Sequence, residues 1–178
     1  MVFVQVLFAL LGVGLAVDLA LVDEKQCTTC QDGWNFHKGN CYRIFKICAT
    51  YDQAEQSCQR NEGNLVSIHN SDENKFVFDL WKDTFNGNKN LWIGLNDKSE
   101  EGQFRWTDDT KWPIEDFDPW ARNEPDDNDG EDCVQLVERG RLAWNVRSCS
   151  IVSPYMCKSA PTVAAADLSS MEDENNDM

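Results

Sequence analysis

Leu91-Trp92-Ile93-Gly94-Leu95 is the stretch of this 178-residue chain that most constrains its fold. Four apolar residues and one glycine in succession, with no charge among them, predict a short strand that is buried on both faces. Candidate partner strands lie on its C-terminal side. Phe104-Arg105-Trp106 alternates as a half-exposed strand does, and Cys133-Val134-Gln135-Leu136 and Tyr155-Met156-Cys157 are two further short strands.

Two helices are predicted on the N-terminal side of that strand. Thr50 and Gln53 have the spacing of a capping box, and Gly63 fits the end of the helix that they begin. Asn70 with Glu73 marks the start of the second helix. Its inward face consists of three apolar residues at helical spacing, namely Phe76, Val77 and Leu80.

The cysteines and the N-terminal segment indicate a secreted, extracellular protein. Eight cysteines in a chain of this length are typical of an oxidising compartment. Residues 1–16 are predicted to be a signal peptide, because Met1 to Val17 is apolar apart from Gln5, and Gly14-Leu15-Ala16 provides the small residues of a cleavage site. Asp18 ends the apolar run before the roughly 20 residues that a membrane span needs, so no membrane insertion is expected.

Four segments are expected along the chain. The signal peptide is followed by a short N-terminal segment at 17–29, one disulfide-stapled domain at 30–158, and a tail at 159–178. The tail contains no Lys, Arg or aromatic residue and has almost nothing to bury. It is therefore predicted to be disordered.

The charge balance narrows the range of partners. The chain has 31 acidic and 16 basic residues, a formal net charge of -15. Such a chain repels nucleic acid phosphates and anionic membranes, so neither is an expected partner, and it attracts cations. An enzyme is the weakest interpretation, because neither His37 nor His69 has a nucleophile or a second nitrogen ligand beside it in the sequence.

The stretch 108–132 has little periodicity, and a loop of that length is usually functional. It holds six carboxylates within nine residues and no base among them: Glu124, Asp126, Asp127, Asp129, Glu131 and Asp132. Like charges this close are mutually destabilising unless a cation lies between them. Hard oxygen ligands in a flexible loop suit Ca2+. The alternative interpretation is a solvated acidic loop without a ligand.

The spacing of several motifs resembles the C-type lectin domain. The matching residues are Trp34, Cys41, Cys58, Trp92-Ile93-Gly94-Leu95, Glu124-Pro125-Asp126, Glu131-Asp132-Cys133, Trp144-Asn145, Cys149 and Cys157. The resemblance covers about residues 30 to 158. It implies an α+β fold with two helices, two small antiparallel sheets, and a long loop region that binds Ca2+ and sugar.

The resemblance also implies three disulfide bridges, which are Cys30–Cys41, Cys58–Cys157 and Cys133–Cys149. Cys27 and Cys48 are left over. They are expected to pair with each other, and the alternative is that one of them links two chains into a homodimer.

A sugar-binding Ca2+ is implied at Glu124, Asp126, Glu131 and Asn145, where the side chains and the ion share two neighbouring sugar hydroxyls. The intervening Pro125 is expected to be cis. The sequence departs from the family pattern twice. Glu124-Pro125-Asp126 is neither the Glu-Pro-Asn of mannose-type members nor the Gln-Pro-Asp of galactose-type members, and Val146 replaces an aspartate. Three carboxylates remain, so a working but weaker site is expected.

A second, auxiliary Ca2+ is implied at Asp97, Glu101, Asp127 and Asp132, with Glu131 contributing as well. This ion would order the loop rather than touch the ligand.

The leading functional hypothesis is a secreted Ca2+-dependent lectin that recognises glycans, in innate immunity or adhesion. Whether its glycans are mannose-type or galactose-type is left open. The alternatives are an acidic structural protein, of a mineral matrix or an ice-binding kind, and a lectin-like module that binds protein without sugar. Five tryptophans are interpreted as packing residues rather than as a platform for sugar: Trp92, Trp106, Trp112, Trp120 and Trp144. Arg122 and Arg147 are interpreted as charge relief for the acidic cluster, and the alternative is that they contact an anionic ligand.

Overall fold

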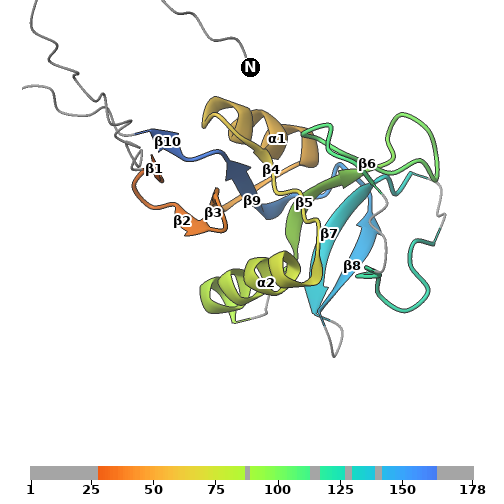
Figure 1. Ribbon diagram of the computed structural model, residues 1–178. Helices are drawn as coiled ribbons and strands as arrows, with labels where there is room; N and C mark the ends of the chain where they lie inside the picture. The colour runs from red at the N-terminus through yellow and green to blue at the C-terminus, as the bar shows by residue number, and fades with distance from the viewer. Residues whose placement is uncertain (1–27, 87–88, 113–116, 127–129, 139–141, 164–178) are drawn as a thin grey trace, which may run out of the picture.

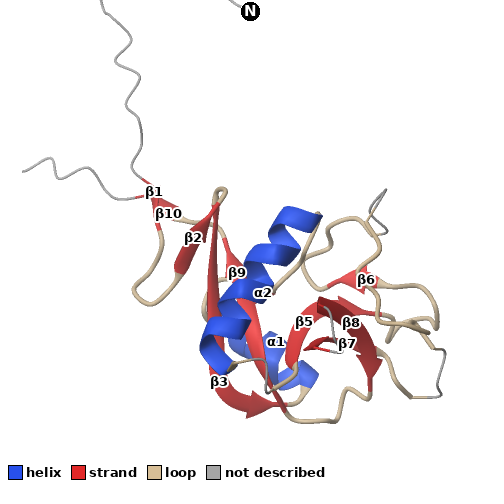
Figure 2. Ribbon diagram, turned by 90° about the horizontal axis from the view of Figure 1, so that it is seen from below, coloured by secondary structure: helices blue, strands red, loops and turns tan. Residues whose placement is uncertain are grey.

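The computed structural model describes residues 28–86, 89–112, 117–126, 130–138 and 142–163. The predicted signal peptide and most of the predicted tail lie outside these residues. Figures 1 and 2 show two helices packed around one large twisted sheet, with loops gathered at one end. The elements are β1 (Thr28–Thr29), β2 (Asn35–His37), β3 (Asn40–Ala49), α1 (Tyr51–Arg60), β4 (Asn64–Leu65), α2 (Ser71–Phe85), β5 (Leu91–Asn96), β6 (Arg105–Trp106), β7 (Cys133–Glu138), β8 (Leu142–Arg147), β9 (Ser153–Ser159) and β10 (Thr162–Val163).

The strands form one eight-stranded sheet and one two-stranded pair. The main path of the larger sheet is β2-β3-β9-β5-β7-β8, with β4 paired to β9 and β6 paired to β5. All its pairings are antiparallel except that of β5 with β9, which meet at Trp92 and Tyr155. The α+β class is confirmed. The two antiparallel sheets expected from the sequence are halves of a single sheet that this parallel contact joins.

Both helices begin where their capping residues predict. The Thr50 side chain accepts from the Gln53 N–H while the Gln53 side chain accepts from the Thr50 N–H, so the capping box is present. Asn70 caps α2 by accepting from the Glu73 N–H at 2.9 Å. These side chains satisfy backbone donors that helix formation leaves without intrahelical partners.

Gly63 has a different role from the one predicted. Helix α1 ends at Arg60, and Asn61 is its C-cap. Gly63 lies against β9 instead, where an added Cβ would come within 2.4 Å of the Lys158 carbonyl oxygen. Close approach of two backbones, rather than the end of a helix, therefore requires glycine here.

Strand β5 lies at the centre of the hydrophobic core. Its side chains from Leu91 to Leu95 are fully buried and divide between two core clusters. Ile93 belongs to the cluster that contains Trp81 of α2, and Trp92 belongs to the cluster that contains Tyr51 of α1. The strand predicted from a continuous apolar run is thus covered on both faces, which fixes where its C-terminal end delivers the next loop.

Three disulfides staple the domain as the family resemblance implied. Cys30–Cys41, Cys58–Cys157 and Cys133–Cys149 all form. Cys48 is exposed and forms no disulfide with any other described cysteine. The expected pairing of Cys48 with Cys27 involves a residue outside the described ranges.

The chain ends of the described region pair with each other. Strand β1 pairs with β10, with Thr28 opposite Val163 and Thr29 opposite Thr162. Hydrogen-bonded structure therefore extends a few residues beyond both limits of the predicted domain, 30–158. Neither helix in the described part of the chain is long and apolar enough to cross a membrane.

Candidate functional site

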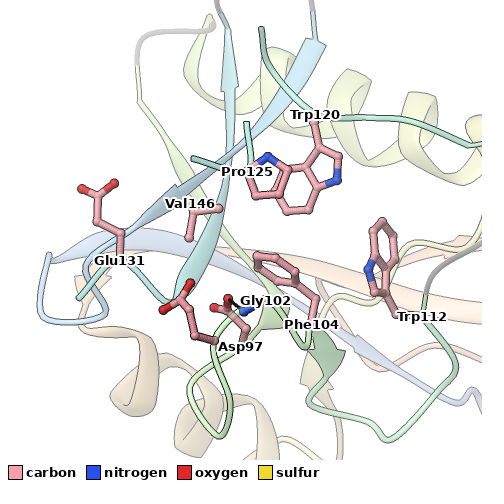
Figure 3. A pocket seen from close by; sticks show the side chains of 9 residues that line it. Asp97, Gly102, Phe104, Trp112, Trp120, Pro125, Glu131 and Val146 are labelled. Atoms are coloured by element: carbon pink, nitrogen blue, oxygen red, sulfur yellow. Dashed lines mark hydrogen bonds between the residues drawn. The ribbon is translucent and has the colours of Figure 1, made fainter. Parts of the chain in front are cut away.

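The loop between β5 and β6, the long loop between β6 and β7, and strand β8 enclose a pocket of about 500 Å³. The lining residues come from several parts of the chain: Asp97, Glu101, Gly102, Phe104, Trp112, Trp120, Pro125, Glu131 and Val146. Figure 3 shows Asp97 and Glu131 on one side, Trp112 and Trp120 on the other, and Phe104 between them. The pocket therefore brings an acidic side and an aromatic side together.

The β7–β8 hairpin positions one side of this pocket. Asn145 of β8 lies opposite Gln135 of β7, and the Cys133–Cys149 disulfide closes the hairpin beside the loop. The loop docks on β8 through Glu124, whose Oε2 accepts from the Val146 backbone N–H at 3.1 Å. The Glu124–Pro125 peptide bond is cis, as expected from the resemblance.

Asn145 carries a buried oxygen to which no group in the described part of the chain donates. The side chain is only 1% exposed, and its Nδ2 donates to the Val146 carbonyl oxygen at 2.7 Å. Its Oδ1 has no hydrogen-bond partner among the described residues. Buried acceptors are normally satisfied, by protein groups, by an ordered water or by an ion. A neutral amide oxygen is a hard donor atom that suits Ca2+.

Asp97 repeats this pattern at the end of β5. Its Oδ2 accepts from the Gly102 N–H at 2.9 Å, and its own N–H donates to the Asp132 carbonyl oxygen at 3.1 Å. Its Oδ1 is buried without a partner among the described residues. Burial, with the Asp132 charge adding to it, raises the pKa of Asp97 despite the hydrogen bonds that favour its ionised form. A cation beside Oδ1 would relieve this cost. Glu101 lines the same pocket.

The remaining predicted ligands are placed less uniformly. Glu131 lines the pocket and lies 3.4 Å from Arg147 Nη1. Asp126 is exposed, and Asp127 lies outside the described residues. Within those residues, no group of three or more Asp, Glu, His or Cys side chains is close enough to hold a metal by itself. A Ca2+ site would therefore need Asn145, backbone oxygens or Asp127 as well.

The aromatic side was only partly anticipated. Trp112 and Trp120 pack edge to face with centroids 6.1 Å apart, and both contact the buried Trp144, as expected of packing residues. They also line the pocket, which was not expected, and Phe104 joins them. Alternation within Phe104-Arg105-Trp106 places both aromatic residues on one face, so it gave no signal that either of them reaches the pocket. Phe104 is half-buried, packs against the core and also lines the pocket.

A nucleophile and a base do meet elsewhere, but not in a usable form. Ser67 Oγ lies 3.2 Å from His69 Nε2 and donates to an Asp108 carboxylate oxygen. Ser67 is completely buried, so no substrate can reach it. Among the described residues, the His69 ring contacts the hydroxyls of Ser67 and Thr110 rather than a carboxylate that could orient it as a base. The other histidine, His37, packs elsewhere: its ring stacks on that of Phe76 with the ring centroids 4.1 Å apart.

Comparison with known proteins gives a consistent result. The sequence matches the family model of the lectin C-type domain over residues 47–159. It is 41% identical over 138 residues to an alpha-N-acetylgalactosamine-specific lectin of Patiria pectinifera, covering 72% of this chain and 79% of that protein. The solved structure of C-type lectin CEL-I from Cucumaria echinata superposes with a TM-score of 0.68 at 34% identity, covering 75% of this chain and 98% of that one. A calcium-independent type II antifreeze protein also superposes with a TM-score of 0.68, at 25% identity over 78% of this chain and 99% of that one.

Proposed function

Because this chain belongs to the C-type lectin domain family, we propose that it is a secreted lectin that binds glycans with the help of Ca2+. The proposal combines the family with the two sides of the pocket. Carboxylates and an unsatisfied amide oxygen favour a hard cation, and the neighbouring aromatic rings favour the apolar face of a sugar ring.

The observation that carries this proposal is the buried Oδ1 of Asn145, to which none of the described residues donates. We assign the sugar-site ion to Glu124, Asp126, Glu131 and this oxygen. When bound, Ca2+ supplies open coordination positions for two neighbouring sugar hydroxyls. Glu124 is already oriented for such a role, because the Val146 N–H holds one of its oxygens.

We assign an auxiliary ion to Asp97, Glu101, Asp127 and Asp132, with Glu131 contributing. The unsatisfied Oδ1 of Asp97 supports this assignment. The Asp97 N–H binds the Asp132 carbonyl, so these two residues already lie side by side. A cation that neutralised Asp97 and Asp132 would hold the end of β5 against Asp132, the residue that leads into β7.

Two observations concern the type of sugar, and together they do not decide between mannose-type and galactose-type ligands. One relative is named as specific for alpha-N-acetylgalactosamine, which is a galactose-type sugar. Against this, Glu124-Pro125-Asp126 matches neither the mannose-type nor the galactose-type motif. Trp112 and Trp120 offer aromatic surface to either kind. Both kinds belong in the test.

Secretion is supported by the three disulfides, which form in oxidising compartments, and by the predicted signal peptide. A soluble extracellular lectin of this type would serve innate recognition or adhesion.

The experiment is elution of the protein from columns of immobilised mannose, galactose and N-acetylgalactosamine, loaded in millimolar Ca2+. We expect retention on at least one sugar and release by a chelator. Asn145→Ala should abolish retention while leaving the circular dichroism spectrum unchanged. Asp79→Asn is the control, since Asp79 is an exposed residue of α2 that pairs with Lys75. Passage through all three columns would contradict the proposal.

A second candidate is a lectin-like module that acts without sugar, as a structural or protein-binding domain. Arg147 favours it, because its guanidinium lies 3.4 Å from Glu131 and could replace a cation there. The antifreeze protein of similar fold is named as calcium-independent. Failure of retention together with an unchanged melting temperature in Ca2+ would move this candidate to first place.

A further inference from the structure

A second pocket, of about 420 Å³, lies beside the end of β3 and the start of β9. Its volume is within the range of small-molecule sites. Lys89 and Arg147 supply two positive charges to its wall, and Asn90 and Gln135 supply two side-chain amides. Among the residues that the structure describes, it shares no lining residue with the first pocket. We call it the Arg147 pocket.

The charge of the Arg147 pocket is opposite to that of the whole molecule. The chain has a formal net charge of -15, yet no Asp or Glu of the described residues lines this pocket. Lys89 is exposed and the Arg147 side chain is 39% exposed, so both can turn toward a ligand. At physiological salt the Debye length is about 8 Å, so two nearby cations act on an anion in the pocket more strongly than distant carboxylates do. The pocket therefore favours an anion.

Arg147 keeps donors for such an anion beside its own ion pair. Its Nη1 lies 3.4 Å from Glu131 Oε1, a long contact between side chains that are 39% and 22% exposed. A guanidinium carries five N–H donors in a planar fork, so a contact through one nitrogen leaves donors for a second acceptor. An oxyanion such as a carboxylate can accept two of them at once.

A buried donor without a partner lies in the wall of the same pocket. Gln135 is 1% exposed, and its Oε1 accepts from Asn90 Nδ2 at 3.0 Å. Its Nε2 has no hydrogen-bond partner in the described part of the chain. A buried polar atom is normally satisfied by a protein group, an ordered water or a ligand. An oxygen of a bound anion would satisfy this donor.

An apolar surface lies beside these donors. Val152 is 60% exposed and Ile151 38%, and both line the pocket together with the buried Pro154. Ser153 Oγ donates to the Asn90 backbone carbonyl at 3.0 Å, which holds the start of β9 against the segment that carries the amide. The C–H face of a sugar ring would gain from contact with these apolar side chains, whereas an inorganic anion would not.

We propose that the Arg147 pocket binds the acidic group of a charged saccharide, a carboxylate or a sulfate ester, without Ca2+. Arg147 and Lys89 hold the oxyanion, and Gln135 Nε2 donates to one of its oxygens. The exposed apolar side chains pack against the sugar ring. The choice of a saccharide rests on the proposed function, whereas the choice of an anion rests on the pocket alone.

The first test is titration of the isotope-labelled mature protein, followed by proton–nitrogen NMR, in chelator and about 0.15 M salt. The probes are sulfated galactose, glucuronic acid and inorganic sulfate, with galactose and glucose as neutral controls. We expect at least one acidic sugar to shift the Gln135 side-chain amide signal to saturation, and the neutral sugars to leave it in place. The acidic sugar that binds identifies the group as a sulfate ester or a carboxylate.

Two outcomes of this titration would overturn the proposal. One is an unchanged Gln135 signal with both acidic sugars, because the pocket would then not bind the acidic group. The other is inorganic sulfate that binds as tightly as the acidic sugars, because the sugar ring would then contribute nothing. Every sample lacks Ca2+, so failure here is distinct from failure of the Ca2+-dependent retention on sugar columns.

The second test assigns binding to the pocket through charge variants in the same titration. Arg147→Gln and Lys89→Gln should each weaken binding about tenfold, as the loss of one charge-assisted contact does. Lys38→Gln is the matched control, since Lys38 is exposed, pairs with Asp72 and lies in the turn before β3. It removes the same charge from another part of the surface. Equal weakening in all three variants would show only general attraction and would overturn the site.

Glu131→Gln should change the affinity in the opposite direction. It removes the carboxylate that competes with the ligand for Arg147, so binding in chelator should tighten roughly threefold, as release of a partly exposed ion pair allows. Asp79→Asn is its control, because it removes a negative charge from α2, where Asp79 pairs with Lys75. Unchanged or weaker binding in Glu131→Gln would contradict the placement of the anion at Arg147.

Discussion

Glu73 and Lys158 form the most buried ion pair of the described residues, with side chains 9% and 12% exposed. Lys158 Nζ and Tyr42 Oη each lie 2.7 Å from Glu73 Oε1, and Glu73 Oε2 accepts from the His69 N–H. Burial alone would raise the pKa of Glu73. The hydrogen bonds from Lys158 and Tyr42, together with the Lys158 charge, outweigh burial and lower it. The pair joins the start of α2 to β9.

Removing this carboxylate should therefore destabilise the domain. We expect Glu73→Ala to cost about 3 kcal/mol in the free energy of unfolding at pH 7, because it leaves Lys158 charged and buried. The folded-state pKa of Glu73 is lowered, so its contribution is present above the unfolded value and is lost as the pH falls through the folded value. Urea unfolding of parent and variant should give a difference that shrinks below about pH 4.

The control for that measurement is Asp72→Ala. Asp72 pairs with Lys38, but the two side chains are 75% and 65% exposed. Exposed pairs contribute little, so we expect a change within about 0.5 kcal/mol. Equal losses in the two variants would show that burial does not determine the strength of the Glu73 pair.

Two further residues decide how a sugar hydroxyl would be held. Glu124 and Asp126 are both acceptors when ionised, and one hydroxyl has only one proton to donate. Asp126→Asn supplies the missing donor, and Val146→Asp restores the third carboxylate. We expect the double variant to bind mannose about tenfold more tightly than the parent in Ca2+, which corresponds to one charge-assisted hydrogen bond. Titration calorimetry measures this. No gain in mannose affinity would show that this loop does not hold sugar.

At the scale of elements, local signals predicted the helices better than the strands. The starts of α1 and α2 depend on capping residues three positions apart, so neighbouring residues alone reveal them. The longest strand, β3, was not predicted, because its register depends on β9, more than a hundred residues later. Strand β8 was not predicted either. Its pairing with β7 in an antiparallel hairpin becomes visible only in the structure.

Gly94 of β5 provides a test at this scale. An added Cβ would lie 2.6 Å from the Leu65 carbonyl oxygen and 2.9 Å from Thr107 Oγ1. The Leu65 backbone cannot move away without disturbing β4, which pairs with β9. We expect Gly94→Ala to lower the free energy of unfolding by about 3 kcal/mol, as overpacking does.

The matched control is Gly39→Ala in the turn between β2 and β3. Gly39 has φ 84° and no atom within 4 Å of an added Cβ, so only the backbone conformation opposes the change. We expect a loss of about 1 kcal/mol in chemical denaturation. A smaller loss in Gly94→Ala than in Gly39→Ala would contradict the close packing of β5 on β4.

At the scale of the whole molecule, the candidate site could be predicted only through the family resemblance. Its residues come from the end of β5, the loop before β7, and β8, and no local pattern joins Asp97 to Asn145. The acidic loop alone was compatible with a solvated surface. The unsatisfied oxygens of Asp97 and Asn145 were invisible in the sequence, because they result from tertiary burial.

If Ca2+ binds at the buried oxygens of Asp97 and Asn145, it should raise the thermal stability of the whole domain. An ion that binds only the folded state adds RT ln(1 + [L]/Kd), about 2.7 kcal/mol at a hundredfold excess over Kd, so we expect the melting temperature to rise by roughly 10 °C in millimolar Ca2+ relative to chelator. Asp97→Asn should remove the part of that shift that arises from the auxiliary site, because it removes one carboxylate and leaves a side chain of similar size. Asn145→Ala should instead abolish sugar retention while preserving most of the shift. Sr2+ in place of Ca2+ would test charge and coordination without altering the protein. If the parent melts at the same temperature with Ca2+ and with chelator, both proposed sites fail, and the unsatisfied oxygens need another explanation.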